Sequence, residues 1–509
     1  MLYGLINAAA YACLLPPWEG FDETYHYGYV QILSTQHAFP ALDHAWLSRE
    51  IWHALELTPV SHYLQPYTHA PLNFTDYFAL PESERLHRRA ALEALPREQQ
   101  SESQLNKPNY EVNQAPLPYL ILAPIESALA AWPITVRLLA LRIAASFTAV
   151  LLLIHAATLL ARRLDLRTPW LEAALFCALS SQMLYATICH VCNDWLAVPL
   201  FTYFVWAAIR TRQTGAPRDA LLLGAIAAAA LLTKAYFLAP LPMAFVAARR
   251  WKPIAWMTLS LTLLAGPWYI RNVLLYHNLS GTVQQSAGVS LRQTIAGAFR
   301  LPWLASIHYM ALSSLWTGNN SFTTFSSATL YIVLLLLAAA LILYARSARF
   351  YAPELLTIST VLVFCCALAG ISVTFFLATK GGAIAAVPWY MQLLLAPVLL
   401  LAFLGLQRTH GTGHWLAIAL AAIWGYILIA TYWIKLIPLY AGYPPGRARL
   451  SDLWAWYLHA APARTSILAT LCLTRPAILY ALAASASLLC LALLGIHFRH
   501  AQTRRSHPA

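Results

Sequence analysis

The sequence is poor in charged residues, and this shortage decides its class. Only 10% of its 509 residues are Asp, Glu, Lys or Arg, whereas 60% are hydrophobic. Soluble domains carry about 25% charged residues, so an ordinary water-soluble fold is excluded. Intrinsic disorder is excluded as well, because 12% of the residues are aromatic and the apolar runs are long. The mean hydropathy of +0.57 instead predicts a helical membrane protein with many spans.

Acidic residues are the scarcest of the charged groups. The chain has 20 Asp and Glu residues against 33 Lys and Arg residues, which gives a net charge of +13. No basic domain stands apart from the apolar stretches, so nucleic acid is not expected as a partner. The eight cysteines lie mostly inside apolar runs, where a thiol behaves as a small apolar side chain, and they predict no disulfide framework.

Long apolar stretches predict transmembrane helices along most of the chain. A short first span covers roughly residues 2–15, and Pro16 and Pro17 after it make a poor context for signal-peptide cleavage. Together the stretches predict about twelve helices in an all-α bundle of a polytopic membrane protein. The further spans cover roughly residues 137–160, 170–188, 194–210, 219–233, 236–248, 253–271, 327–345, 354–377, 387–406, 415–434 and 476–497.

Basic residues predict which side of the membrane each loop faces. Cytoplasmic loops retain an excess of Lys and Arg. If residue 1 lies inside and the spans alternate, the short outside turns hold only Lys234 and Lys380. The short inside segments then hold Arg162, Arg163, Arg167, Arg210, Arg212, Arg218, Arg249, Arg250, Lys252, Arg346, Arg349, Arg408, Arg499, Arg504 and Arg505.

This orientation divides the chain into outer loops and membrane segments. It predicts a first helix at 1–17, a first outer loop with juxtamembrane helices at 18–136, and a transmembrane core at 137–275. Two further outer loops follow at 276–326 and 438–475. The remaining segments are transmembrane helices at 327–437 and a last helix with a basic cytoplasmic tail at 476–509.

Carboxylates gather near the start of the chain, since fourteen of the twenty precede residue 130. The densest group is Glu19, Asp22 and Glu23, with His26 one helical turn after Asp22. Spacing of i,i+4 places Asp22 and His26 on one face if a helix starts there. The group then suits a general base with an orienting partner, or a metal site. A capped interfacial helix explains the same residues without any chemistry.

A single carboxylate, Asp194, stands at the predicted outer boundary of a span. A carboxylate beside hydrocarbon is costly and is a functional candidate for that reason. An ordinary role near a helix N-terminus, where the helix dipole favours an acid, is the alternative.

Six short motifs occur in an order that resembles one known group of membrane proteins. They are Pro17 with Asp22, Glu23 and His26; Gln114-Ala115-Pro116-Leu117-Pro118-Tyr119; Arg142; Asn193-Asp194; Leu231-Leu232-Thr233-Lys234; and Trp268-Tyr269-Ile270-Arg271-Asn272. In this order and on the predicted outer side, they resemble the GT-C superfamily of polyprenyl-phosphate-sugar glycosyltransferases. The likeness is closest to bacterial predicted membrane proteins related to the protein mannosyltransferase and aminoarabinose transferase families, and it covers about residues 12–275.

The chain departs from this pattern at three points. Ala115 stands where the second motif has its first proline, and Gln114 stands where a basic residue is common. The late Gly-Arg-Tyr segment of these families corresponds here to Pro388-Trp389-Tyr390-Met391-Gln392, which has no arginine. The departures imply an altered donor or an inactive relative.

The resemblance implies a GT-C-type enzyme of the plasma (inner) membrane that takes part in cell-envelope glycan synthesis. Such an enzyme moves a hexosyl or pentosyl unit, with inversion, from a polyprenyl-phosphate-sugar donor to a hydroxyl of a glycan, lipid or protein on the extracytoplasmic side. Asp22 would be the catalytic base, with Glu23 as the second choice. The implied substrate-binding residues are His26, Gln114, Tyr119, Arg142, Asp194, Lys234 and Arg271.

The roles within that set differ. His26 would orient Asp22 or touch the donor, and Asp194 would orient the acceptor. Lys234 and Arg271, and less directly Arg142, would stabilise the departing phosphate. No cofactor is required by the motifs; if Mg²⁺ or Mn²⁺ is used, Asp22 and Asp194 are the candidate ligands.

Other interpretations of the same residues stay open. Lys234 can snorkel from a helix end, and Arg271 can anchor the chain at the membrane interface. A glycan ligase of the O-antigen-ligase type would place essential Arg or His residues in the segments 277–326 or 438–475. A lipid-linked sugar flippase or transporter would carry charged residues midway along its spans.

Overall fold

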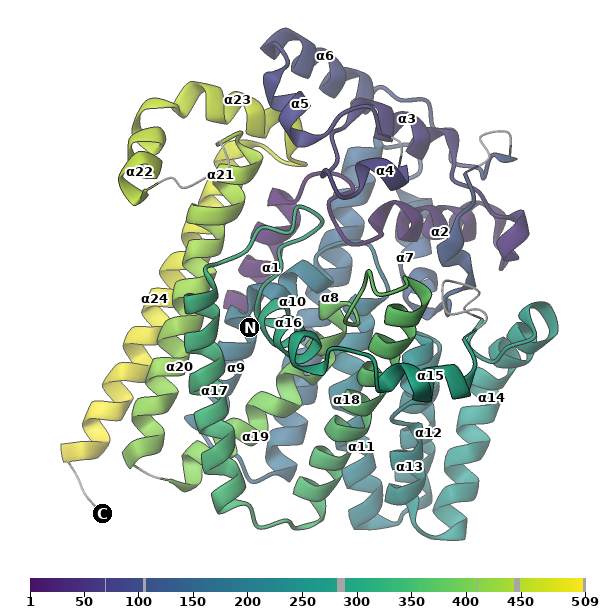
Figure 1. Ribbon diagram of the computed structural model, residues 1–509, viewed down its shortest axis with the longest axis vertical. Coiled ribbons are helices and arrows are strands. Elements are labelled where there is room, and N and C mark those ends of the chain that lie inside the picture. Colours follow the sequence, from purple (N-terminus) through teal and green to yellow (C-terminus); the bar gives the residue numbers. More distant parts are fainter. Residues whose placement is uncertain (69, 104–106, 282–288, 410, 444–448, 507–509) are drawn as a thin grey trace.

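The computed structural model is a bundle of helices (Figure 1). It describes residues 1–509 except 69, 104–106, 282–288, 410, 444–448 and 507–509. The chain is 76% helical, and the described residues form isolated β-bridges but no strand. The predicted all-α class is therefore confirmed.

Six helical segments are long and apolar enough to cross a membrane. A seventh is added if α9 (Trp170–Ser180) and α10 (Gln182–Ile188), which meet at a 59° bend, form one broken span. These segments support a membrane protein, because long apolar helices have no comparable partner in water. The six are α8 (Ile134–Arg163), α17 (Ser327–Ser347), α18 (Ala352–Ala378), the segment Pro388–Arg408 that ends with α19 (Leu395–Arg408), the segment Gly411–Tyr440 that starts with α20 (Gly411–Ala430), and Pro476–Phe498 of α24 (Pro476–Ser506).

The other predicted spans are helical but do not reach the same length and apolarity, so twelve spans are not confirmed. They are α1 (Leu2–Leu14), α11 (Asp194–Thr214), α12 (Pro217–Leu231), η4 (Ala235–Leu238) with α13 (Leu241–Ala248), and α14 (Trp251–Tyr276). Some of them are short, and α11 and α14 are long enough but not apolar enough.

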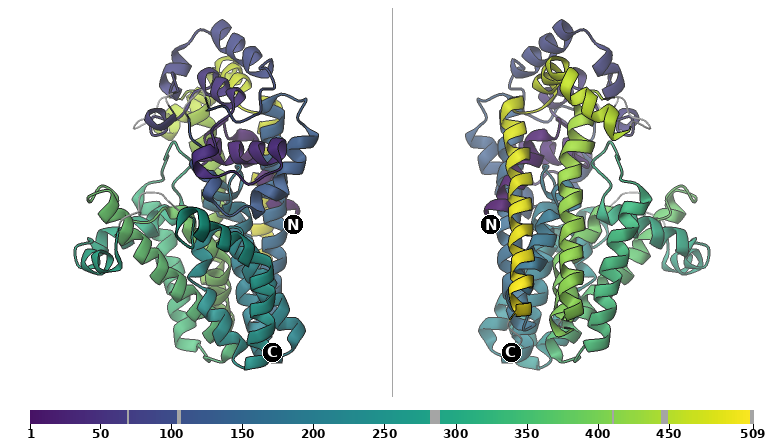
Figure 2. Two further views of the ribbon diagram at one scale, coloured as in Figure 1. Left: turned by 90° about the vertical axis from the view of Figure 1, so that its right-hand side faces the viewer. Right: turned by 90° about the vertical axis from the view of Figure 1, so that its left-hand side faces the viewer.

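The short helix α1 lies inside the bundle, where it packs against α8 and α24. Its face is rich in alanine, which lets neighbouring helices approach closely. Asn7 on this helix is fully buried and donates a 3.1 Å hydrogen bond to the carbonyl of Leu179. Figure 2 shows α20 and α24 side by side along one flank of the bundle. The segment that follows α1 therefore emerges from the centre of the molecule.

Polar segments form a cap over one end of the bundle, at the top of Figure 1. Within it, α2 packs on α7 and η3, and α6 packs on α23. Two further helices, α15 (Leu291–Ala298) and α16 (Trp303–Leu315), lie beside the long helices, where α15 packs on α18 and α16 on α17 (Figure 1). The cap elements are α2 (Glu23–Gln36), η1 (Leu42–His44), α3 (Arg49–Leu57), α4 (Gln65–Thr68), α5 (Phe74–Ala79), α6 (Glu82–Glu93), η3 (Tyr110–Asn113), α7 (Leu117–Ala128), α21 (Ile437–Tyr440), α22 (Leu450–His459) and α23 (Ala461–Leu471).

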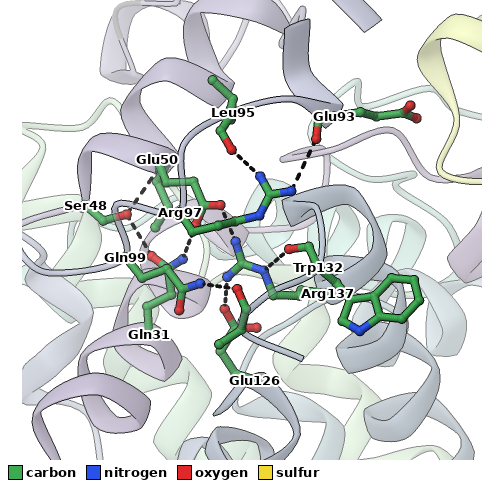
Figure 3. A network of polar contacts seen from close by, with 12 residues as sticks. Gln31, Ser48, Glu50, Glu93, Leu95, Arg97, Gln99, Glu126, Trp132 and Arg137 are labelled. Carbon is green, nitrogen blue, oxygen red and sulfur yellow. Dashed lines mark hydrogen bonds and ion pairs between the residues drawn. The ribbon is translucent and has the colours of Figure 1, made fainter. Parts of the chain in front are cut away.

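One buried cation fastens the cap to the bundle (Figure 3). Arg137 near the start of α8 pairs with Glu50 of α3 and Glu126 of α7, and the three side chains are fully shielded from solvent. The Tyr27 hydroxyl of α2 donates to Glu126 at 2.9 Å, and Gln31 donates to Glu50 at 3.0 Å. A buried charge is tolerated only when paired and hydrogen-bonded. The network therefore holds α2, α3 and α7 in register above α8.

Candidate functional site

The chain turns sharply between α1 and α2, and this turn places Asp22. Asp22 has a φ of 54° in the left-handed region, which Asp adopts more readily than most residues. It is the N-cap residue of α2, but its side chain makes no capping hydrogen bond. The helix therefore starts where the sequence predicts, and the Asp22 carboxylate is left to point elsewhere.

The Asp22 carboxylate accepts a 2.7 Å hydrogen bond from the hydroxyl of Tyr110 in η3. Its second oxygen has no hydrogen bond to any described residue. Burial raises the pKa of Asp22, while the Tyr110 hydrogen bond and the Lys234 charge partly oppose the rise. A partly exposed carboxylate with one unused oxygen and a raised pKa has the properties of a general base.

Glu23, the neighbouring acid, is fully engaged by Arg142 of α8. The Arg142 Nε donates to Glu23 at 2.7 Å, a second guanidinium nitrogen pairs with the other carboxylate oxygen, and both side chains are buried. The backbone N–H of Val191 donates to the same carboxylate at 3.0 Å. Arg142 also donates to the carbonyls of Leu15 and Pro16 at 2.5 and 2.8 Å. This bidentate pair clamps the turn that carries Asp22 and uses up the hydrogen-bonding groups of both side chains.

His26 lies on α2 one turn beyond Asp22, but its contacts are with other residues. Its Nδ1 lies 2.8 Å from the Tyr119 hydroxyl and 3.4 Å from a Glu111 carboxylate oxygen. Burial lowers the pKa of His26, so the imidazole is neutral near pH 7. The partner that orients Asp22 is therefore Tyr110, and His26 ties Tyr119 to Glu111.

Asp194 and Lys234 form a buried ion pair. The Lys234 Nζ donates to both carboxylate oxygens of Asp194 at 2.9 and 2.8 Å, and the Tyr236 hydroxyl donates to one of them at 2.9 Å. Burial lowers the pKa of Lys234, but the Asp194 carboxylate outweighs it and the net shift is upward. Lys234 is therefore a permanent cation, held 4.6 Å from the ring centre of Tyr390.

The segment without the expected arginine forms a wall of the same region. Tyr390 faces Lys234, and the Trp389 ring stacks on Phe21 with 4.0 Å between ring centres. The Asn193 side chain donates a 3.4 Å hydrogen bond to Gln114. Residues from five of the six sequence motifs thus meet around the turn that carries Asp22.

Arg271, from the sixth motif, has local partners. Its guanidinium donates to the carbonyls of Phe39 and Pro40 at 3.3 and 2.7 Å and lies 4.8 Å from the ring centre of Trp268. Within the described residues no contact joins it to Asp22 or Lys234. Arg271 therefore secures the chain that follows α2.

Glu111 is a member of the site that the sequence analysis did not select. Its side chain is buried, and Oε2 has no hydrogen-bond partner among the described residues. Burial raises its pKa well above the ordinary value, and the Asp22 charge raises it further. The available signal was its place in the short polar stretch just before Gln114, but eighty-eight positions separate it from Glu23 in the chain.

No known protein family, curated protein or solved structure matches this chain. The function is therefore argued from the chemistry of the site.

Ligands for a metal ion do not converge in the described part of the chain. No group of three or more His, Cys, Asp or Glu side chains there is placed to hold one. Asp22 and Asp194, the predicted candidates, have Tyr110 and Lys234 as their partners. All eight cysteines are free thiols, as predicted. In the site, the Asp22 carboxylate keeps one free oxygen and lies near the buried cation Lys234, and Glu111 keeps one carboxylate oxygen without a hydrogen bond to a described residue.

Proposed function

We propose that the protein is an integral membrane glycosyltransferase that moves a sugar from a polyprenyl-phosphate donor to an acceptor hydroxyl on the extracytoplasmic side. One observation carries the proposal. A carboxylate with a free oxygen, Asp22, lies close enough to a charged ammonium, Lys234, for that charge to lower the pKa of Asp22. Transfer from a phosphate to a hydroxyl needs such a pair.

In the proposed reaction, Asp22 takes the proton of the acceptor hydroxyl. The acceptor oxygen forms a bond to the anomeric carbon of the sugar as the bond from that carbon to the phosphate oxygen breaks. The electron pair of the broken bond stays on the departing lipid phosphate. Attack on the side opposite the leaving group inverts the anomeric configuration.

Lys234 stabilises the charge that develops on the leaving phosphate. In the free protein its ammonium is paired with Asp194, which also accepts a hydrogen bond from the Tyr236 hydroxyl. A bound phosphate group then shares the ammonium with Asp194, whose second function is to keep Lys234 charged and aimed in a site with little water. Such preorganised charge is the largest catalytic contribution in many enzymes.

Glu23 and Arg142 position the base. Their bidentate pair grips the turn before α2 through the carbonyls of Leu15 and Pro16. Glu111 and His26 hold Tyr119 against the same helix. These residues are positioning residues in the proposal, because their polar atoms face each other.

The ligase alternative draws little support from its late loop. One of its arginines, Arg464, lies 5.2, 4.9 and 5.7 Å from the ring centres of Trp456, Tyr457 and Tyr480. Stacking of a guanidinium among rings is a packing arrangement.

The test is transfer by purified protein in nanodiscs, with a panel of polyprenyl-phosphate sugars and release of polyprenyl phosphate as the readout. We expect Asp22→Asn to lower the rate at least about 100-fold, the usual size of a general-base contribution. The matched control is Asp43→Asn, an exposed acid of the same cap that should keep the wild-type rate. Wild-type rates in Asp22→Asn, or no release by wild-type protein from any donor, would overturn the proposal.

A further inference from the structure

A second polar cleft lies at the opposite end of the bundle from the candidate site. The 30 residues of α8 span about 45 Å, and the cleft opens where that helix ends. It has a volume of about 440 Å³ and is formed by the link between α8 and α9, the link between α17 and α18, and the end of α19. The residues that line it include Asp165, Arg167, Trp170, Arg349, Tyr351 and Arg408.

Positive charge dominates the lining of this cleft. Arg167 and Arg349 are exposed, and neither guanidinium has a hydrogen bond or ion pair with a described residue. Arg408 is held in place by the buried Glu354 at 2.5 Å and by the carbonyl of Ser347 at 3.1 Å. Asp165 is the one acid in the lining. Two arginines from different loops thus face one space that holds a single acid, and neither forms an ion pair with a described residue.

An unpartnered hydroxyl completes the cleft. The Tyr351 Oη is buried and makes no hydrogen bond with a described residue. Buried polar groups are nearly always hydrogen-bonded, so this hydroxyl is available to donate to a group bound in the cleft. Arginine forks and a hydroxyl donor are the groups that bind a phosphate.

The cleft is rigidly built. The Gln407 side chain accepts a 2.8 Å hydrogen bond from the backbone N–H of Arg167 and donates one of 2.9 Å to the carbonyl of Asp165. The loop that carries Arg167 is therefore tied to the end of α19.

An apolar groove continues from the cleft along the surface of the bundle. The two share Trp170 and His414, and the groove is lined by Ala173 of α9 and by Ala417, Ile418 and Ala421 of α20. Small residues leave a shallow channel in which an alkyl chain can lie. A basic cleft joined to an apolar groove matches a molecule with an anionic head and a hydrocarbon tail.

We propose that this cleft binds an anionic phospholipid, with the headgroup phosphate between Arg167 and Arg349 and one acyl chain in the groove. The site does not depend on the proposed glycosyl transfer, because it uses none of the same residues. The charge pattern of the sequence predicts this end of the bundle to face the cytoplasm, where the leaflet is negatively charged.

The experiment measures lipid retention. Purified protein is passed from phosphatidylcholine–phosphatidylglycerol nanodiscs into mild detergent, and the bound lipid is counted by native mass spectrometry. We expect one phosphatidylglycerol on the wild-type protein. The variant Arg167→Gln/Arg349→Gln should retain at least tenfold less. The matched control Arg162→Gln/Arg346→Gln removes two basic residues near the same end that do not line the cleft, and it should retain the wild-type amount.

A milder variant guards against misfolding. Tyr351→Phe removes only the orphan hydroxyl and should lower retention severalfold with an unchanged elution volume. Inorganic phosphate tests whether the cleft binds a free anion instead of a lipid headgroup. At millimolar concentration, phosphate should not raise the midpoint temperature of thermal unfolding, whereas phosphatidylglycerol should. Equal retention by the cleft variants and the control would overturn the proposal. A phosphate effect as large as the lipid effect would overturn it too.

Discussion

The Tyr110 hydroxyl donates a 2.7 Å hydrogen bond to Asp22, a residue 88 positions earlier in the chain. This bond is the one direct restraint on the Asp22 carboxylate among the described side chains. It joins the helix α2 to the segment just before α7. It also stabilises the charged form of Asp22 and so tunes the proposed base.

The proposed base should show itself in the pH dependence of the reaction. Burial raises the pKa of Asp22, so transfer requires deprotonation above the ordinary carboxyl range and kcat/KM should rise with pH through that limb. Tyr110→Phe removes a hydrogen bond that lowers the pKa. The acidic limb should therefore move to higher pH by about one unit. The measurement is kcat/KM against pH for both proteins.

The control for this shift is Tyr25→Phe. The Tyr25 ring lies 4.3 Å from that of Tyr110, but its hydroxyl does not bond Asp22. The acidic limb of kcat/KM for Tyr25→Phe should lie at the same pH as that of the wild-type protein. If the acidic limb of kcat/KM in Tyr110→Phe stays at the wild-type pH or moves to lower pH, the assignment of Asp22 as the base is contradicted.

Variants of the Asp194–Lys234 pair should affect folding stability and transfer activity differently. Asp194→Asn leaves a buried ammonium without its counter-charge and should cost about 3–5 kcal/mol. The double variant Asp194→Asn/Lys234→Met has no uncompensated charge and should recover most of that stability, as measured by thermal unfolding in detergent. Both variants should lack transfer activity, because the double variant has no cation for the phosphate and Asp194→Asn no longer keeps Lys234 charged and aimed.

Lys252→Met, at an exposed lysine of α14, serves as the control for loss of a charge and should change neither property. A double variant that regains both stability and activity would show that Lys234 has only a structural role.

The buried network at Arg137 should control whether the cap stays docked. Arg137→Gln leaves Glu50 and Glu126 without their shared cation and should lower the unfolding free energy by about 3–5 kcal/mol. Limited proteolysis should then cut the cap segment 37–110 faster than in the wild-type protein. Arg88→Gln breaks a surface pair on α6, and such pairs contribute about 0–1 kcal/mol, so its cleavage rate should match wild type. Equal cleavage of the two variants would refute this role.

Part of the site follows from spacing in the sequence. Asp22, Glu23 and His26 are neighbours on one helix start, so their proximity needs no tertiary information. The division of labour between them does. Glu23 is bound by Arg142 from 119 positions away, and Asp22 by Tyr110 from 88 positions away. The choice between two adjacent carboxylates therefore depends on which side of the turn each one faces.

Glu111 shows the same limit. In the sequence it is one acid among the fourteen before residue 130, with no pattern that separates it from the others. In the fold Glu111 is buried against His26. The charge of nearby Asp22 raises the pKa of Glu111. The burial of Glu111 depends on how the cap packs, so the local sequence does not predict it.

Six or seven of the twelve predicted spans are supported by the structure. Hydropathy marks α12, α13 and α14 as apolar, but it does not tell a helix buried among other helices from one that crosses lipid. The segment 219–248 ends one helix at Leu231 and begins the next at Leu241, so neither piece is long. The helices α12 and α13 are shorter than the supported spans, whereas α14 is long enough but not apolar enough, so length and composition together limit the supported spans to six or seven.

By itself, the scarcity of charge determined that the chain is helical and membrane-embedded, because so apolar a chain has no soluble fold. The scarcity of charge also limited the number of candidate catalytic residues, since few carboxylates lie away from the ends of spans. Only the tertiary structure decided which charges remain available. In the low-dielectric interior Glu23, Asp194 and Glu126 are paired with cations, whereas Asp22 keeps a free oxygen and Arg167 and Arg349 form no ion pair with a described residue.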